Sequence, residues 1–277
     1  MRQNHPSSFL SSSSGANYVV PVIDVTTLQD EEMALSKFAA YWTDPASRTR
    51  VLNVLGLNVS DTELGKEISL PRLVRELGWA QILGIEKETK SVAKYVLFST
   101  GNSYTDFHVD FGGSSVWYHV PRGHKIFYLI RPTEHNLCLF ERWSSMSAAA
   151  AAKRDTPFFG DLVDCCYKVH LREGGLVLMP GGWIHAVFTP VDTVAIAGNF
   201  LQIHSISMQL RISELEGRNG EPAKYRFPHF TALHELIGKH YLELLGSCVA
   251  HLFIFLFFLC SLFLLIYLFI HLFFNSN

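Results

Sequence analysis

The chain has 277 residues, of which 48% are hydrophobic and 17% charged, and its formal net charge is −2. This composition excludes a disordered, collagen-like or coiled-coil protein, and the charge balance gives no reason to expect direct DNA binding. The five cysteines form no CxxC pair, so we expect neither a zinc module nor a disulfide framework, and an intracellular protein.

The apolar residues are concentrated at the C-terminal end. No Lys, Arg, Asp or Glu occurs from residue 244 to residue 277, and this segment holds 8 of the 21 Phe residues. The first 243 residues therefore carry all the charge, and they are long enough to bury the core of one domain.

The N-terminal part is expected to contain a leader followed by alternating strands and helices. Residues 1–19 are rich in Ser and lack the apolar run of a secretory signal, so they predict a flexible leader. The β-branched stretch Val20–Val25 and the alternating stretch Val51–Val59 predict strands. Helical spacing predicts one helix over Thr27–Trp42 and another beginning near Pro71.

The central block changes to a shorter period, with β-rich runs separated by Gly, Pro and Asn. We predict strands at Tyr95–Phe98, Tyr104–Asp110, Ser114–Val120, Lys125–Ile130, Leu176–Met179, Ile184–Phe188 and Val194–Phe200. The low-complexity stretch Ser144–Thr156 predicts an exposed loop or a short helical turn. Two amphipathic helices are expected afterwards, one from Ile206 and one over Pro228–Leu245. The fold class is therefore mainly β with flanking helices (α+β), arranged as a jelly-roll or barrel.

A candidate metal site begins with His108 and Asp110. One residue separates them on a predicted strand, so both side chains should lie on the same face. His185, in the run PGGWIHAV, is the candidate third ligand. Two imidazoles and one carboxylate suit a non-haem Fe(II) oxygenase, because they leave coordination positions open. The alternative is a chance HxD in a chain with 13 histidines, with His108 in a structural role.

A candidate co-substrate site surrounds Lys125, which lies in the otherwise apolar context HKIFYLI. A dicarboxylate such as 2-oxoglutarate needs a cation for its far carboxylate, and Thr105 and Tyr118 offer hydroxyl groups on the same side. The alternative is an edge position, with the lysine stem packed and its amine in water.

These residues lie within longer motifs, namely NSYTDFHVDFGGSSVWYHVPRGHKIFYLI, FFGDLVDCCYK, MPGGWIHAVFTPVD and AGNFL. Together they closely resemble the JmjC-domain histone lysine demethylases, nearest to the PHD-finger branch, over about residues 20–245. The resemblance implies a cupin-like double-stranded β-helix at about 95–200 and a helical part at 205–245. It implies Fe(II) ligands at His108, Asp110 and His185. It implies that 2-oxoglutarate is bound by Thr105, Lys125, Tyr118 and Asn53, with Asn199 near the metal as a catalytic candidate.

The resemblance also implies an activity, namely demethylation of mono- and dimethyl-lysine on histone H3 tails, which regulates chromatin and transcription in the nucleus. Ala197 stands where relatives usually carry Gly, which favours an alternative, a catalytically weak chromatin scaffold. A second alternative is a JmjC protein hydroxylase. The first 20 residues contain no cysteine, so no zinc-binding PHD finger is expected in this chain.

Residues 249–274 form a candidate transmembrane helix. Leu252–Phe274 would be roughly 35 Å long at about 1.5 Å per residue, against a hydrocarbon core of about 30 Å. One interpretation is a C-terminal membrane anchor. The other is that the segment is not native coding sequence, because the resemblance stops near Gly246.

Overall fold

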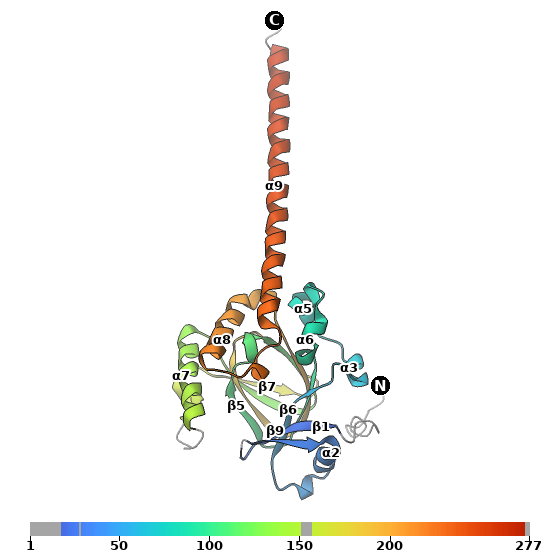
Figure 1. The fold of residues 1–277 in the computed structure, drawn as a ribbon, viewed down its shortest axis with the longest axis vertical. Helices are drawn as coiled ribbons and strands as arrows, with labels where there is room; N and C mark the ends of the chain where they lie inside the picture. Colours follow the sequence, from blue (N-terminus) through green and yellow to red (C-terminus); the bar gives the residue numbers. More distant parts are fainter. Residues whose placement is uncertain (1–17, 28, 151–156, 275–277) are drawn as a thin grey trace. The chain divides into compact units, whose positions relative to one another are not determined.

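The computed structural model describes residues 18–27, 29–150 and 157–274 of the chain. The chain divides between Pro228 and His229 into two compact units, and each is considered by itself. The first unit has an antiparallel β core with helices around it, and the second contains one long helix (Figure 1).

The β core is one continuous sheet of nine strands within the described residues. Along the sheet the strand order is β2, β1, β3, β4, β9, β6 and β7, while β5 pairs with β9 and β8 pairs with β6. The strands are β1 (Val19–Asp24), β2 (Gln29–Ala34), β3 (Leu52–Asn58), β4 (Tyr95–Ser99), β5 (Ser103–His108), β6 (Ser115–Ile130), β7 (Tyr167–Arg172), β8 (Leu176–Met179) and β9 (Ile184–Phe200).

Helices occur in the connections and at the C-terminal end. The α-helices are α2 (Leu35–Thr43), α3 (Glu63–Glu67), α4 (Arg72–Leu77), α5 (Trp79–Ile82), α6 (Glu86–Ala93), α7 (Glu134–Ala150), α8 (Ile206–Arg218) and α9 (Phe230–Phe274). Short 3₁₀ turns are η1 (Pro45–Ser47), η2 (Phe111–Gly113), η3 (Phe159–Leu162), η4 (Ile203–Ser205) and η5 (Ala223–Tyr225).

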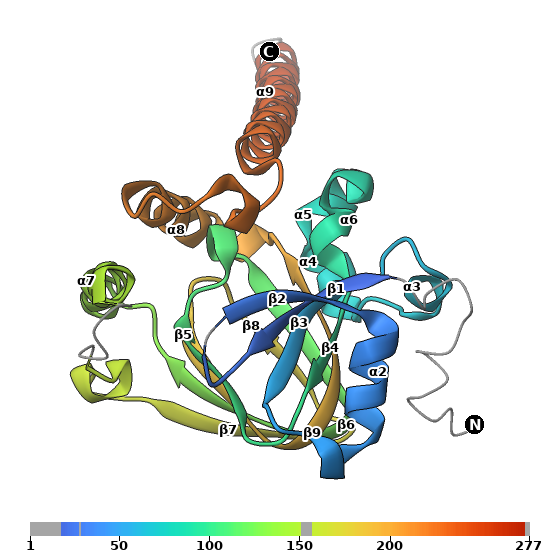
Figure 2. The same cartoon turned by 60° about the horizontal axis from the view of Figure 1, so that its bottom comes forward.

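The two longest strands, β6 and β9, fold the sheet back on itself. They pair along most of their length, with register shifts between His119 and Ile126. The first half of β9 pairs with β5 and the second half with β4. In the same way, β8 pairs with the first half of β6 and β7 with its second half. The result is two facing sheets that share β6 and β9, which confirms the predicted jelly-roll core (Figure 2).

The core consists of three apolar clusters in successive layers. Between the two sheets lie Leu97, Val116, Tyr118, Val120, Phe127, Leu171, Met179, Ala195 and Ala197. On the outer side of β3 and β4, Phe38 of α2 packs against Val54, Val96 and Phe98. A third cluster packs α7, α8 and η3 onto the strands of the other sheet, through residues that include Phe107, Ile130, Phe140, Phe159, Ile184 and Ile212. Because apolar residues cover both faces of β4, the sequence of this strand is apolar at nearly every position and does not alternate.

The structure corrects several predicted elements in the β core. The helix predicted over Thr27–Trp42 is wrong in its first half, because Gln29–Ala34 pairs with β1 as a hairpin and α2 begins only at Leu35. The strands predicted at Ser114–Val120 and Lys125–Ile130 are one bent strand, and those at Ile184–Phe188 and Val194–Phe200 are another. Strand β7 was not predicted.

The low-complexity stretch Ser144–Thr156 was also predicted incorrectly in part. Its first seven residues continue α7 to Ala150, since Ser and Ala are compatible with a helix that Glu134 begins. Residues 151–156, and the predicted leader up to residue 17, lie outside the described residues.

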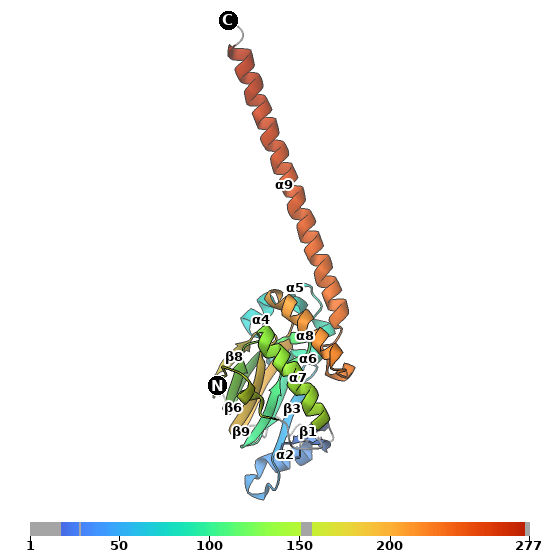
Figure 3. The same cartoon turned by 90° about the vertical axis from the view of Figure 1, so that its left-hand side faces the viewer.

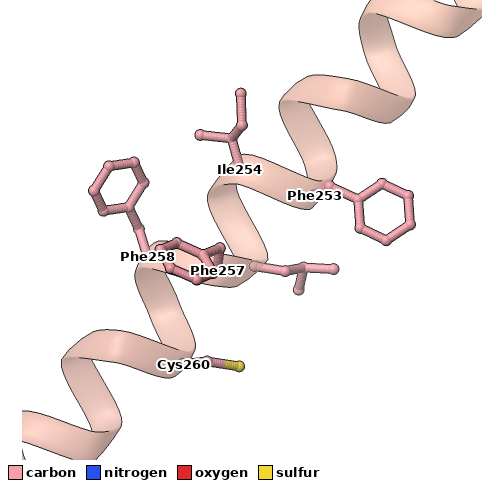
Figure 4. Close-up of a pocket in the computed structure, with 6 residues that line it drawn as sticks. Phe253, Ile254, Phe257, Phe258 and Cys260 are labelled. Atoms are coloured by element: carbon pink, nitrogen blue, oxygen red, sulfur yellow. The ribbon is translucent and has the colours of Figure 1, made fainter.

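The second unit is dominated by α9, a single helix of 45 residues (Figure 3). The helix predicted over Pro228–Leu245 and the apolar segment after it are thus continuous. Its part from Phe230 to Phe263 is long and apolar enough to cross a membrane by length and composition, and none of its apolar window is buried. Figure 4 shows Phe253 and Phe258 among the side chains that project outward from this helix in different directions.

Candidate metal centre

Three potential metal ligands converge at one end of the β core. His108 ends β5 and lies directly opposite His185 near the start of β9. The two imidazole rings have centroids 4.1 Å apart, and His185 Nε2 lies 3.7 Å from Asp110 Oδ2. One ligand atom from each residue lies within 4.8 Å of the other two, so His108, Asp110 and His185 could hold a single metal ion.

Asp110 reaches this site from outside the strand on which it was predicted. Strand β5 ends at His108, and Asp110 immediately precedes the short turn η2. Its backbone is nevertheless extended, with φ −64° and ψ 141°. Because the extended conformation continues past the last ladder pair, the alternation of side chains persists and Asp110 still shares a face with His108.

The backbone sets the orientation of both imidazoles. His108 Nδ1 lies 2.8 Å from the carbonyl oxygen of Asp106, and His185 Nδ1 lies 3.1 Å from that of Trp183. Since a carbonyl only accepts, each Nδ1 carries the hydrogen and each Nε2 keeps its lone pair for a metal. Burial, with a smaller contribution from the neighbouring His108, lowers the pKa of His185 to about 4, so this imidazole is neutral near pH 7.

A β-bulge in β5 places Thr105 on the same face as the candidate metal ligands. Thr105 lies opposite Val187 and His108 opposite His185, so three steps along β5 match two steps along β9. In a regular strand, residues three apart point to opposite faces. The extra residue of the bulge removes this difference, and Thr105 and His108 both point between the sheets.

Lys125 is buried between the two sheets, with 3% of its surface exposed. Its ammonium donates to Ser99 Oγ on β4 at 2.6 Å and to Thr189 Oγ1 on β9 at 2.7 Å. The alternative of an edge lysine with its amine in water is therefore wrong. Burial lowers the pKa of Lys125 to about 7. An ammonium has three N–H donors, so one remains for a ligand.

Unsatisfied polar atoms flank this ammonium. Asn53 on β3 pairs in register with Ser99, and Ser103 on β5 pairs with Thr189. Asn53 Oδ1 and Ser103 Oγ are buried and have no hydrogen-bond partner within the described part of the chain. Buried polar groups without partners are costly, so the surroundings of Lys125 fit a polar ligand.

The remaining predicted residues lie on neighbouring strands. Tyr118 is buried on β6 with its ring 5.3 Å from that of Phe127, and burial raises the pKa of its phenol, which stays protonated. Asn199 on β9 donates from Nδ2 to Ser114 Oγ at 3.0 Å. This bond ties Asn199 to the segment just after η2, and its proximity to the metal stays a prediction.

Sequence reasoning missed three polar residues of the interior, Ser99, Thr189 and Tyr95. Burial raises the pKa of Tyr95 to about 12, with a further contribution from the charge of Asp110, so the phenol lies within the electrostatic field of that carboxylate. The alternation of side chains along the predicted strand could have identified two of these residues, because Tyr95 and Ser99 share the inner face of β4. Serine and threonine are too common in strands for that signal to stand out.

Residues 95–200 match the family described as "JmjC domain, hydroxylase", and residues 204–250 match the "Jumonji helical domain". The chain therefore contains a JmjC domain.

Three of the similar proteins are named as demethylases. This JmjC chain is 48% identical over 232 residues to "Histone lysine demethylase PHF8" of Danio rerio, a match that covers 83% of this chain and 22% of the relative. It is 44% identical to "Lysine-specific demethylase 7B" of Danio rerio, covering 83% and 40%, and 42% identical to "Lysine-specific demethylase 7A" of Homo sapiens, covering 83% and 24%. The chain thus spans well under half the length of these relatives.

Proposed function

We propose that this chain is an Fe(II)- and 2-oxoglutarate-dependent dioxygenase that demethylates mono- and dimethyl-lysine on histone H3 tails. The observation that carries the proposal is the convergence of His108, Asp110 and His185 at one end of a core that also encloses Lys125. The names of the relatives, which are histone or lysine-specific demethylases, support the substrate class.

The three ligands fit Fe(II) by their chemistry. Two Nε2 lone pairs and one carboxylate are the donor set of non-haem Fe(II) oxygenases and leave positions open for co-substrate and O₂. When bound, Fe(II) would supply the oxidative chemistry that removes a methyl group as formaldehyde while 2-oxoglutarate becomes succinate and CO₂. The neutral state of His185 favours metal binding, because the metal does not have to displace a proton from that ring.

The protein's own contribution is to bind and orient the dicarboxylate. His185 and Thr189 lie on the same face of β9, four residues and so about 13 Å apart along the strand. A five-carbon dicarboxylate can bridge that span when the side chains at both ends reach toward it. The third N–H of Lys125 would bind the far carboxylate, with Thr105, Tyr118 and Asn53 as the proposed polar neighbours.

An assay of formaldehyde release from dimethyl-lysine H3 peptides, with Fe(II), ascorbate and 2-oxoglutarate, tests the proposal. We expect turnover by the chain, none by His108→Ala, and unchanged turnover by His170→Ala, which replaces an exposed histidine of β7. Absence of turnover by the unsubstituted chain, or equal turnover by His108→Ala, would refute it.

Mass spectrometry of the same peptides separates a second candidate function. The family description includes the word hydroxylase, and a protein hydroxylase would leave a stable alcohol. Loss of a methyl group supports demethylation, and a gain of one oxygen supports hydroxylation. A chain that binds neither metal nor 2-oxoglutarate would instead be a non-enzymatic chromatin scaffold.

For location, we propose the nucleus, where histone tails are found, and anchoring of the chain in a membrane by the apolar part of α9. The support for anchoring is the length of this part, its lack of charge and its exposure. In flotation with phosphatidylcholine vesicles, the chain should rise with the lipid and a Leu256→Arg, Phe257→Asp variant should remain below. If both remain below, the helix is not an anchor.

A further inference from the structure

A buried carboxylate of α8 is bonded to the turn that follows the metal ligand Asp110. Glu216 is 9% exposed, and its Oε1 accepts a hydrogen bond of 2.6 Å from the backbone N–H of Gly112. Gly112 lies two residues after Asp110, whose carbonyl oxygen accepts from the N–H of Gly113 at 3.0 Å. The side chain of Glu216 therefore acts on the same turn that holds the backbone of Asp110.

The turn is packed between α8 and the turn that precedes β9, the strand that carries His185. Gly113 has φ +58°, and a Cβ there would lie 2.9 Å from the carbonyl oxygen of Met208 on α8. A Cβ on Gly181, four residues before His185, would lie 2.1 Å from the carbonyl oxygen of Gly113. Both glycines permit a backbone approach that no side chain would allow. The ligands Asp110 and His185 thus depend on one shared contact.

Glu216 is an unusual residue to bury at this position. Burial raises its pKa, while the Gly112 hydrogen bond and the charge of Arg226 act in the opposite direction. Arg226 donates to the backbone oxygen of Glu216 at 3.3 Å, so its guanidinium lies beside the same turn of helix. A buried carboxylate is costly unless it is hydrogen-bonded, and within the described residues Glu216 accepts this bond from Gly112, outside α8.

We propose that Glu216 is a positioning residue for the metal, because its bond to Gly112 fixes the turn that presents Asp110. The inference rests on the proposed function and deepens it, because it makes the helical segment after the β core part of the metal site. Residues outside the ligand set that orient a ligand commonly change metal affinity by about 10- to 100-fold.

Two substitutions separate the hydrogen bond from the charge. Glu216→Asp keeps the carboxylate but shortens the side chain by one methylene, so it no longer reaches Gly112. Glu216→Gln loses the charge but keeps an oxygen that can accept from the Gly112 N–H. Glu214→Ala is the matched control, because Glu214 is exposed on the same helix.

Calorimetric titration of the metal-free chain with Co(II), with its visible absorption as a second readout, tests the inference without catalysis. We expect Glu216→Asp to raise the Kd for Co(II) by about tenfold or more, and Glu216→Gln and Glu214→Ala to stay within about threefold of the unsubstituted chain.

Thermal unfolding of each metal-free variant shows whether it is folded. Equal Kd values for Glu216→Asp and the unsubstituted chain would overturn the inference alone, leaving the proposed function intact. Equal weakening by Glu216→Asp and Glu216→Gln would also overturn it, because the charge would then be what matters.

If Glu216→Asp does not fold, Glu216→Gln still tests the inference. A Glu216→Gln protein that folds but binds Co(II) tenfold more weakly would overturn it, and one that binds normally supports it. An unsubstituted chain that binds no Co(II) would overturn the inference and the proposed metal site together.

Discussion

Replacement of the buried Lys125 by Met is expected to remove the pH dependence of 2-oxoglutarate binding. Burial lowers the pKa of Lys125 from 10.5 to about 7, which corresponds to about 5 kcal/mol against the charged form. A carboxylate bound to the ammonium would raise this pKa again, because the opposite charge favours the protonated state. Binding therefore takes up a proton when the pH exceeds 7.

The size of the effect follows from the protonated fraction. With a pKa of about 7, half of the free protein carries the ammonium at pH 7 and about one part in thirty at pH 8.5. Since only the protonated form binds the carboxylate well, the Kd for 2-oxoglutarate should rise roughly 15-fold over this interval. Without ligand, the folded protein binds fewer protons than the unfolded chain between pH 7 and 10.5, so its stability should rise with pH there.

Calorimetry of the chain with Mn(II) in place of Fe(II), in buffers of different ionisation enthalpy, measures both the Kd and the proton uptake. Lys125→Met should bind weakly at every pH and take up no proton. Lys168→Met, at an exposed position on β7, should behave as the unsubstituted chain. A Kd that is constant from pH 7 to 8.5, or a Lys125→Met variant with full affinity, would refute the reasoning.

Four further substitutions test the packing and the candidate metal ligands. Gly198→Ala would place a Cβ 1.9 Å from the carbonyl oxygen of Ala93 and should lower the unfolding free energy by about 1–3 kcal/mol, whereas Gly217→Ala has open space and should raise it by about 0.5–1 kcal/mol. Urea titrations measure both, and equal effects would contradict the contact. Phe159→Ala, at a fully buried ring, should cost about 3–5 kcal/mol in the same titration, and a cost below 1 kcal/mol would mean that the site is not tightly packed. His108→Ala should abolish Co(II) binding while the metal-free chain still unfolds cooperatively, and retained affinity would exclude His108 as a ligand.

The candidate metal ligands could be predicted because their chemistry is rare and their spacing is local. A histidine and an aspartate one residue apart in an extended segment share a face whether or not the strand includes both, so Asp110 was placed correctly beside His108 although β5 ends before it. Lys125 stood out because a lysine in an apolar run has few structural explanations. The partners Ser99 and Thr189 did not stand out, because only the pairing of β4 and β9 brings them to the ammonium.

The errors in the fold have one physical origin, which is that local periodicity does not report strand pairing. Met33 and Phe38 fit a helical spacing, yet Met33 belongs to a hairpin strand and Phe38 to the helix after it. In the same way, Pro121 and Gly123 in β6 and Pro190 in β9 suggest turns, whereas pairing with the neighbouring strands keeps each strand continuous through its register shifts. Strand β7 carries Lys168, His170 and Arg172 on alternate positions, and so lacks the apolar content on which the other strands were recognised.

The bulge between Thr105 and His108 makes the spacing of the binding residues depend on a single extra amino acid. Deletion of Asp106 would restore regular alternation while the ladder partners on β9 remain available. Thr105 and His108 would then lie two residues apart and would still face inward together, whereas without the bulge their present three-residue spacing would turn one of them outward. In this chain the register of one strand pair, as much as the identity of its residues, therefore decides which side chains face the same space.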